Sequence, residues 1–295
     1  MQTKKNGITR GYASTVGGQV HYAEAGEGTP LLLLSATPRT HRCYLPLMKL
    51  LAPELRAIAI DMPGFGNSHG LPQPLDVPAL AECVIHFMDA MHLESAHVFG
   101  LHTGNKLAAA LASQWPDRID HLILAGQSHS IIPDMHERNN AIQVWFDKYK
   151  TYYEPDAAGA HLVRDWLCAQ TNMNAIWWPA QLLNGKVITP ADIEHAEARA
   201  IDFVQGWRSA VPVYEAVFAF DLADAYRRIM APTLVLELRT KGESDIAGQA
   251  QKACALIRGS HAASLIEADG LALEYRPGEF AKPILDFLNH REVVA

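Results

Sequence analysis

The segment AHVFGLHTGNKLAAALA, residues 96–112, decides how the rest of the chain is interpreted. Residues 96–101 form a short apolar run that is typical of a buried strand, and residues 105–112 are rich in helix formers. Between them Gly100, His102 and Gly104 predict a sharp corner from strand to helix, where the two backbones approach too closely for side chains at the glycines. The central residue of such a corner takes a left-handed conformation, in which histidine is one of the enriched non-glycine residues. The sequence therefore predicts an imidazole at the tip of a strained corner.

Short apolar runs bounded by turn residues recur on both sides of this corner and predict further buried strands. They are residues 30–36, 56–61, 121–126, 232–238 and 262–268. Near the N-terminus, residues 12–16 and 20–25 predict a β-hairpin around a Gly-Gly turn. Segments with helical spacing of apolar residues lie between the strands, at residues 41–51, 76–91, 245–257 and 278–290. This alternation predicts an α/β fold, a mostly parallel sheet with helices on both faces.

A long helical stretch interrupts the alternation between residues 131 and 229. Apolar residues recur there at helical spacing, and no strand pattern is found. We therefore expect residues 1–130 and 230–295 to form an α/β core, and residues 131–229 to form a helical cap inserted between two strands. Five of the six tryptophans belong to this stretch, namely Trp145, Trp166, Trp177, Trp178 and Trp207.

The composition narrows the range of partners. Hydrophobic residues make up 49% of the chain and charged residues 19%, and a formal net charge of -7 argues against nucleic acid and anionic membrane surfaces. No apolar run is long enough to span a bilayer, and no apolar segment of a signal peptide follows the basic N-terminus. The cysteines (Cys43, Cys83, Cys168, Cys254) are far apart, and the histidines lack metal-ligand spacing. We expect a reduced, cytoplasmic protein that binds a small molecule without a metal or cofactor, with a homodimer left open.

Four segments in a fixed order carry a resemblance to a known family. They are DMPGFGNS at residues 61–68, the corner around His102, PTLVL at residues 232–236, and RPGEF at residues 276–280 ahead of a last helical run. In these segments the chain resembles the α/β-hydrolase superfamily, of the kind that carries a helical cap, over nearly its whole length. The resemblance implies an α/β-hydrolase fold in which the corner is the nucleophile elbow. A fold by itself does not establish an activity.

The chemical positions depart from the pattern of that superfamily. His102 stands where the superfamily has its nucleophilic serine. No histidine occurs between His261 and His290, where the resemblance places the catalytic base. The segment GESD, residues 242–245, matches the superfamily's Gly-x-x-Asp, so the resemblance implies Asp245 as the acid. Serine hydrolysis by the usual route is therefore excluded.

Two classes of function are compatible with an imidazole at this corner. In the first, His102 is a general base or a nucleophile, and the backbone N–H groups of Thr37 and Thr103 form an oxyanion hole beside it. Such a site suits hydrolysis by activated water, or lyase chemistry, on a small and mainly apolar substrate. In the second, the chemistry is lost and the chain binds a small molecule on the hydrolase scaffold. A cofactor-free oxygenase is a third alternative, drawn by analogy from other proteins of the fold.

Further residues are candidates for the same site, each with a structural alternative. Arg39 binds a substrate carboxylate, or it is solvated or paired with a protein acid. His129 replaces the missing base, or it is a loop residue. Glu237 is a second candidate for the acid and needs a partner if it is buried, whereas Asp61 is expected to anchor the turn after it. The predicted substrate contacts are Ser128, at the end of a strand, and Trp145, Trp177 and Trp178, which alternatively form the core of the cap.

Overall fold

The computed structural model describes residues 7–126, 157–160, 189–238, 248–265 and 272–289. Eight strands lie in these residues, and every strand expected from the sequence is among them, with ends that shift by a few residues. They are β1 (Thr9–Thr15), β2 (Gly18–Ala25), β3 (Thr29–Leu34), β4 (Leu55–Ile60), β5 (Ala96–Leu101), β6 (Ile119–Ala125), β7 (Thr233–Leu238) and β8 (His261–Leu265).

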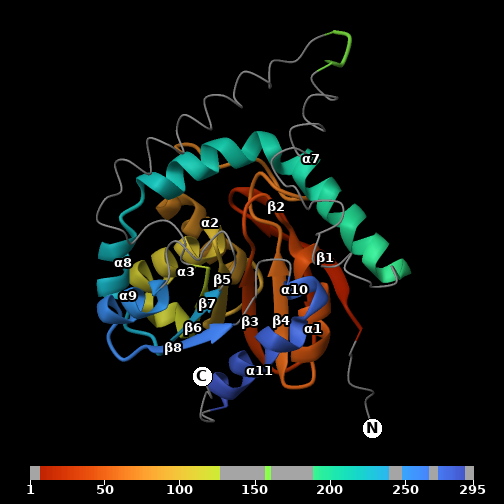
Figure 1. Cartoon of the computed structure of the whole chain (residues 1–295). Coiled ribbons are helices and arrows are strands. Elements are labelled where there is room, and N and C mark those ends of the chain that lie inside the picture. The colour runs from red at the N-terminus through yellow and green to blue at the C-terminus, as the bar shows by residue number, and fades with distance from the viewer. Residues whose placement is uncertain (1–6, 127–156, 161–188, 239–247, 266–271, 290–295) are drawn as a thin grey trace.

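The strands form one sheet in the order β1-β2-β4-β3-β5-β6-β7-β8 (Figure 1). β2 pairs antiparallel with both β1 and β4, as the predicted hairpin requires for the first pair. The five remaining pairs, from β4·β3 to β7·β8, are parallel. The predicted mostly parallel α/β architecture is therefore confirmed.

β3 shows why both faces of this sheet are covered. Successive side chains of a strand point to opposite faces, so a strand with a continuous apolar run has to be covered on both faces of the sheet. Leu31 and Leu33 pack into the core on one face, and Leu32 and Leu34 pack into the core on the other. All four leucines are fully buried.

The helices divide between these two faces. On the face of Leu32 lie α2 (Val77–Ala90), α3 (Thr103–Gln114), α8 (Leu222–Arg228) and α9 (Gln249–Leu256). On the face of Leu31 lie α1 (Leu45–Leu51), α10 (Ala272–Tyr275) and α11 (Pro277–Leu288). The helix predicted at residues 41–51 is split, because a 3-10 helix, η1 (His41–Tyr44), precedes α1. The short helix α10 is not predicted from the sequence, since four residues are too few to show a helical period.

The helix α7 (Pro190–Ala219) crosses the end of the sheet where β5 joins α3 (Figure 1). It reaches the loop after β3, since the Tyr214 hydroxyl donates a 2.7 Å hydrogen bond to the Thr37 carbonyl oxygen. β6 and β7 pair directly although α7 and α8 lie between them in the sequence. Most of residues 131–229 lie outside the described part of the chain, so the division into core and cap stays a prediction. None of the described helices has both the length and the apolar character needed to cross a membrane.

Candidate functional site

The corner between β5 and α3 has the predicted geometry. His102 follows β5 directly and is the N-cap residue of α3, with φ 49° and ψ -104°. A Cβ atom on Gly100 would overlap the carbonyl oxygen of Gly104, and a Cβ atom on Gly104 would overlap that of Leu34. Both glycines are therefore required by the close approach of strand and helix backbones. The imidazole is presented at the carboxyl end of a central parallel strand, where open α/β sheets bind ligands.

The His102 side chain is half-buried and lies against the end of β6. Its backbone N–H donates to the Ala125 carbonyl oxygen at 3.0 Å. A side chain on Gly126, which has φ +65°, would overlap the Nδ1 atom of the ring. Burial of the ring, and then the nearby Lys106 ammonium, lower the pKa of His102 to about 4, although a hydrogen bond with the Gly126 backbone opposes the shift. The imidazole is therefore neutral at pH 7.

The two expected oxyanion donors meet beside this corner. Thr103 is the first residue of α3, and the first N–H groups of a helix have no partner within the helix. The Thr37 N–H is engaged, since it donates to the Thr103 Oγ1 atom at 3.3 Å. A substrate oxygen would therefore have to displace the Thr103 hydroxyl from the Thr37 N–H, and the oxyanion hole stays a prediction. The described residues around Thr37 and Thr103 enclose a cavity of about 10 Å³, room for one water molecule.

Arg39 lies in the same loop and is paired with protein acids, one of the alternatives left open by the sequence. Its Nη2 atom is 2.5 Å from Oε1 of Glu274, and its Nε atom is 3.4 Å from Oδ2 of Asp202. Arg42 approaches the other oxygen of Asp202 at 2.8 Å. These side chains join the loop after β3 to α7 and to α10. The guanidinium of Arg39 therefore has a structural role, and the prediction that it binds a substrate carboxylate is not supported.

Asp61 follows β4 and is the centre of a buried hydrogen-bond cluster. Its Oδ2 atom accepts from His21 Nδ1 at 2.9 Å and from the Asn67 N–H at 3.2 Å. Its Oδ1 atom accepts from the backbone N–H and from Nδ1 of His41, both at 2.8 Å. Burial alone would raise the pKa of Asp61, but hydrogen bonds from His21 and His41 outweigh it and lower the pKa. The predicted anchoring of the turn is confirmed, because the Ser68 hydroxyl also donates to the Asp61 carbonyl oxygen at 2.6 Å.

The same three side chains are a group whose atoms could bind a metal. One ligand atom from each of His21, His41 and Asp61 lies within 4.8 Å of the others. Two imidazoles and a carboxylate are ligands that transition metals accept. The carboxylate already accepts four hydrogen bonds, however, which is its full capacity. We therefore interpret the group as a structural cluster.

The Glu237 side chain accepts hydrogen bonds from the start of α9, whose N-cap residue is Gly248. Glu237 is buried in β7, where its Oε1 atom accepts from the Gly248 N–H at 2.9 Å and its Oε2 atom from the Ala250 N–H at 3.3 Å. A carboxylate at a helix N-terminus accepts hydrogen bonds from otherwise unpaired N–H groups and is attracted by the positive end of the helix dipole. These bonds supply the partner that a buried Glu237 needs, and they give it a structural role.

The remaining predicted site residues lie outside the described part of the chain, and their roles stay predictions. They are Ser128, His129, Trp145, Trp177, Trp178 and Asp245.

Two residues of α3 were missed by the sequence analysis although they stand beside His102. Asn105 is fully buried, and its Oδ1 atom accepts from the Tyr226 hydroxyl of α8 at 2.7 Å. Lys106 is buried as well, with 3% exposure. The signal for them in the sequence was a pair of polar residues directly before the apolar run of residues 107–112.

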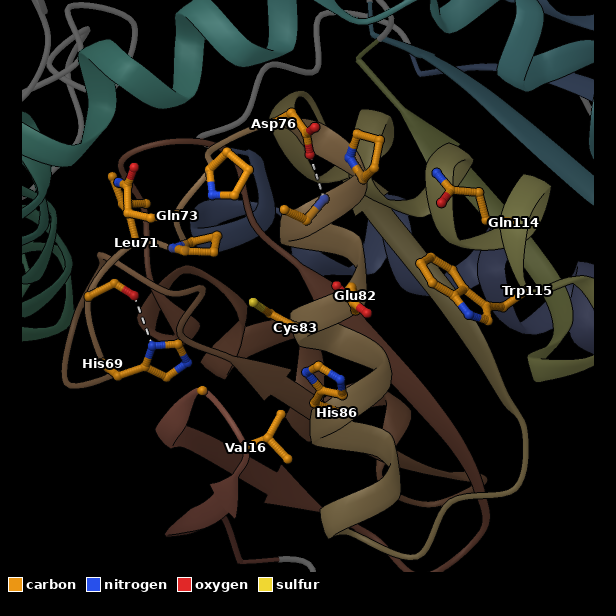
Figure 2. Close-up of a pocket in the computed structure, with 16 residues that line it drawn as sticks. Val16, His69, Leu71, Gln73, Asp76, Glu82, Cys83, His86, Gln114 and Trp115 are labelled. Carbon is orange, nitrogen blue, oxygen red and sulfur yellow. Dashed lines mark hydrogen bonds between the residues drawn. The ribbon is translucent and has the colours of Figure 1, made fainter.

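A separate, open groove of about 690 Å³ lies along α2 (Figure 2). It runs from Val16 in the β1–β2 turn past Cys83 and His86 to Trp115, which follows the last residue of α3. α3 has 12 residues and therefore separates Trp115 from His102 by about 18 Å. In the groove, Asp76 caps α2 by accepting from the Ala79 N–H at 2.7 Å. The groove is distinct from the candidate site at the corner.

Known proteins are similar to this chain in sequence. A family model described as "alpha/beta hydrolase fold" matches residues 29–173. A poly(3-hydroxyalkanoate) depolymerase of Ectopseudomonas oleovorans is 32% identical over 97 residues, which cover 33% of this chain and only 34% of that protein. A proposed carbamate hydrolase of Caulobacter sp. (strain K31) is 27% identical over 222 residues, 74% of this chain and 75% of that protein.

A solved structure agrees with this likeness. The enol-lactonase of Burkholderia xenovorans LB400 superposes with a TM-score of 0.73 at 22% identity, and the match covers 95% of this chain and 100% of that one. At this identity the likeness concerns the fold alone. The sheet order, the helices on both faces, the strand-to-helix corner and these similarities together identify the chain as a protein of the α/β-hydrolase fold.

Proposed function

We propose that this protein hydrolyses a small, mainly apolar organic substrate, with His102 as the general base. The observation that carries the proposal is an imidazole held with a positive φ at the end of β5, at the first turn of α3. Its lowered pKa keeps the ring in the form that accepts a proton. The relatives support hydrolysis. The Caulobacter protein is a proposed carbamate hydrolase, and another relative is a 2-hydroxymuconate semialdehyde hydrolase of Pseudomonas sp. (strain CF600).

The reaction proposed for an ester begins with water. His102 takes one proton from the water, and the oxygen attacks the carbonyl carbon, whose π electrons move to oxygen. The Thr103 N–H at the start of α3 stabilises this oxyanion, with help from the helix dipole. When the tetrahedral intermediate collapses, the bond to the leaving group breaks, and the imidazolium returns the proton to the leaving oxygen. A covalent acyl-imidazole, formed if His102 attacks directly, is the alternative that mass spectrometry would detect.

The test is hydrolysis of a graded series of p-nitrophenyl esters, together with a lactone and a carbamate. We expect His102→Ala to lose about 10²–10⁴-fold in rate, the usual contribution of a general base. His92→Ala is the matched control. His92 is the other described non-glycine residue with a positive φ, 55°, and it is exposed at the end of α2. Equal rates for wild type and His102→Ala on every substrate would refute the proposal.

A binding protein without catalysis is the second candidate function. It is favoured by the small cavity of about 10 Å³ that the described residues enclose beside Thr103. It is also favoured by the missing serine and the missing histidine after β8. Under this alternative, His102→Ala leaves the affinity for a ligand nearly unchanged, and no substrate of the series turns over. A cofactor-free oxygenase would instead consume oxygen with an aromatic substrate.

A further inference from the structure

The start of α3 carries a buried lysine one helical turn beyond His102. Lys106 exposes only 3% of its surface, and lysine is among the residue types that are most rarely buried. Every other residue from Thr103 to Ala112 is buried too, so the lysine occupies a position that an apolar side chain could fill. Removing an ammonium group from water is costly. Its presence so close to the imidazole therefore calls for an explanation in terms of the site.

The His102 ring and the Lys106 side chain meet at one residue, Gly126. The Lys106 Nζ atom is 3.5 Å from the Gly126 carbonyl oxygen. On the same residue, the position of a Cβ atom is filled by Nδ1 and Cε1 of the His102 ring. Gly126 directly follows β6 and has φ +65°, a conformation that favours glycine. The ammonium group and the imidazole are therefore neighbours on one side of the corner.

We propose that Lys106 is a positioning residue of this site, whose ammonium group disfavours the imidazolium form of His102 and so keeps the ring ready to accept a proton. Two like charges that approach the same residue repel each other, and the positive end of α3 acts in the same direction. Two groups described beside the ring act on its charge: the ammonium group of Lys106, from α3, and the backbone of Gly126, directly after β6. A role of Lys106 in catalysis rests on the proposed function. The effect of its charge on the protonation of His102 does not depend on that function.

This charge has a cost for catalysis as well as a benefit. A lower pKa leaves the imidazole neutral in weakly acidic solution, but it also makes the ring a weaker base. Lys106 therefore widens the pH range of the site toward acid and lowers its maximal rate. Removal of the charge should move the acid limb of kcat/KM toward the ordinary histidine pKa of about 6.5. A purely structural lysine would instead lower the rate equally at every pH.

The test is a titration of the histidine rings by NMR, with ¹³Cε1-labelled histidine and with His102→Gln to assign the signal. Wild type should show no titration of His102 between pH 8 and pH 5. In Lys106→Met the midpoint should rise by about one pH unit or more. Lys252→Met removes an exposed lysine of α9 and is the control for net charge. If Lys106→Met does not fold, Lys106→Gln removes the charge with a polar side chain of similar length.

Two results would overturn the proposal. One is a wild-type His102 that titrates near its ordinary pKa, a result that does not depend on any Lys106 variant. The other is the same His102 midpoint in wild type and in the folded Lys106 variant, which would mean that the lysine is neutral or too distant. Both readouts are independent of turnover. A chain that hydrolyses nothing but shows the expected shift would refute the proposed function and leave the role of Lys106 intact.

Discussion

Replacement of Asp61 by asparagine is expected to cost the fold far more than the loss of one charge would suggest. Each carboxylate oxygen accepts one backbone N–H, from His41 to Oδ1 and from Asn67 to Oδ2. Each also accepts one imidazole Nδ1. An asparagine has one acceptor oxygen and one donor NH₂ group, so whichever way it is turned, a backbone N–H faces a donor. The imidazoles can change tautomer, but a backbone N–H cannot.

The magnitude follows from these contacts. A hydrogen bond to a charged group contributes about 1.5–3 kcal/mol, and a buried donor left without an acceptor costs about 1–3 kcal/mol. Because Asp61 is completely buried, solvent does not replace the lost bonds. We therefore expect Asp61→Asn to lower the free energy of unfolding by about 3–5 kcal/mol, similar to the loss of one partner from a buried ion pair.

The assay is urea denaturation at pH 7, followed by tryptophan fluorescence and by circular dichroism. Asp76→Asn is the matched control, because Asp76 is an exposed N-cap and asparagine caps a helix about as well as aspartate. The control should change the free energy of unfolding by less than about 0.5 kcal/mol. If Asp61→Asn cost no more than the control, the four hydrogen bonds would not contribute as argued. Since the folded-state pKa of Asp61 is lowered, its contribution is present above pH 4 and is lost as the pH falls further.

Three other substitutions test separate parts of the structure. Gly126→Ala should destabilise the fold by at least about 1–2 kcal/mol, because φ is +65° and a methyl group would displace the His102 ring; Gly70→Ala, with open space around it, is the control in thermal melts. Burial lowers the pKa of His97 to about 4, so the neutral form is favoured in the fold, and this contribution is lost as the pH falls from 6.5 toward 4. His97→Phe should flatten that part of a stability–pH curve, and an unchanged slope would contradict the assignment. Glu237→Gln should cost about 1–2 kcal/mol in urea without a change in kcat, whereas a catalytic acid would lose rate instead.

Local backbone geometry could be predicted well from the sequence. The spacing of Gly100 and Gly104 around His102 predicts the corner, because only residues without a side chain fit where β5 and α3 approach. The run of four leucines predicts a central strand that is buried on both faces, and β3 is such a strand. The helix expected from residue 76 begins as predicted, because Asp76 is its N-cap and accepts from the Ala79 N–H. Each of these features depends on neighbours within a few residues.

Side-chain partners were decided by the tertiary structure. His21 and His41 reach Asp61 across 40 and 20 positions, and Arg39 reaches Glu274 across 235. The spacing of residues in the sequence does not predict such contacts, because they form only when strands and helices pack. The sequence by itself determined that an imidazole stands at the tip of the corner. That the ring lies against Gly126, with a buried ammonium group beside it, followed from the packing of α3 on β6, since burial and nearby charge are properties of the assembled fold.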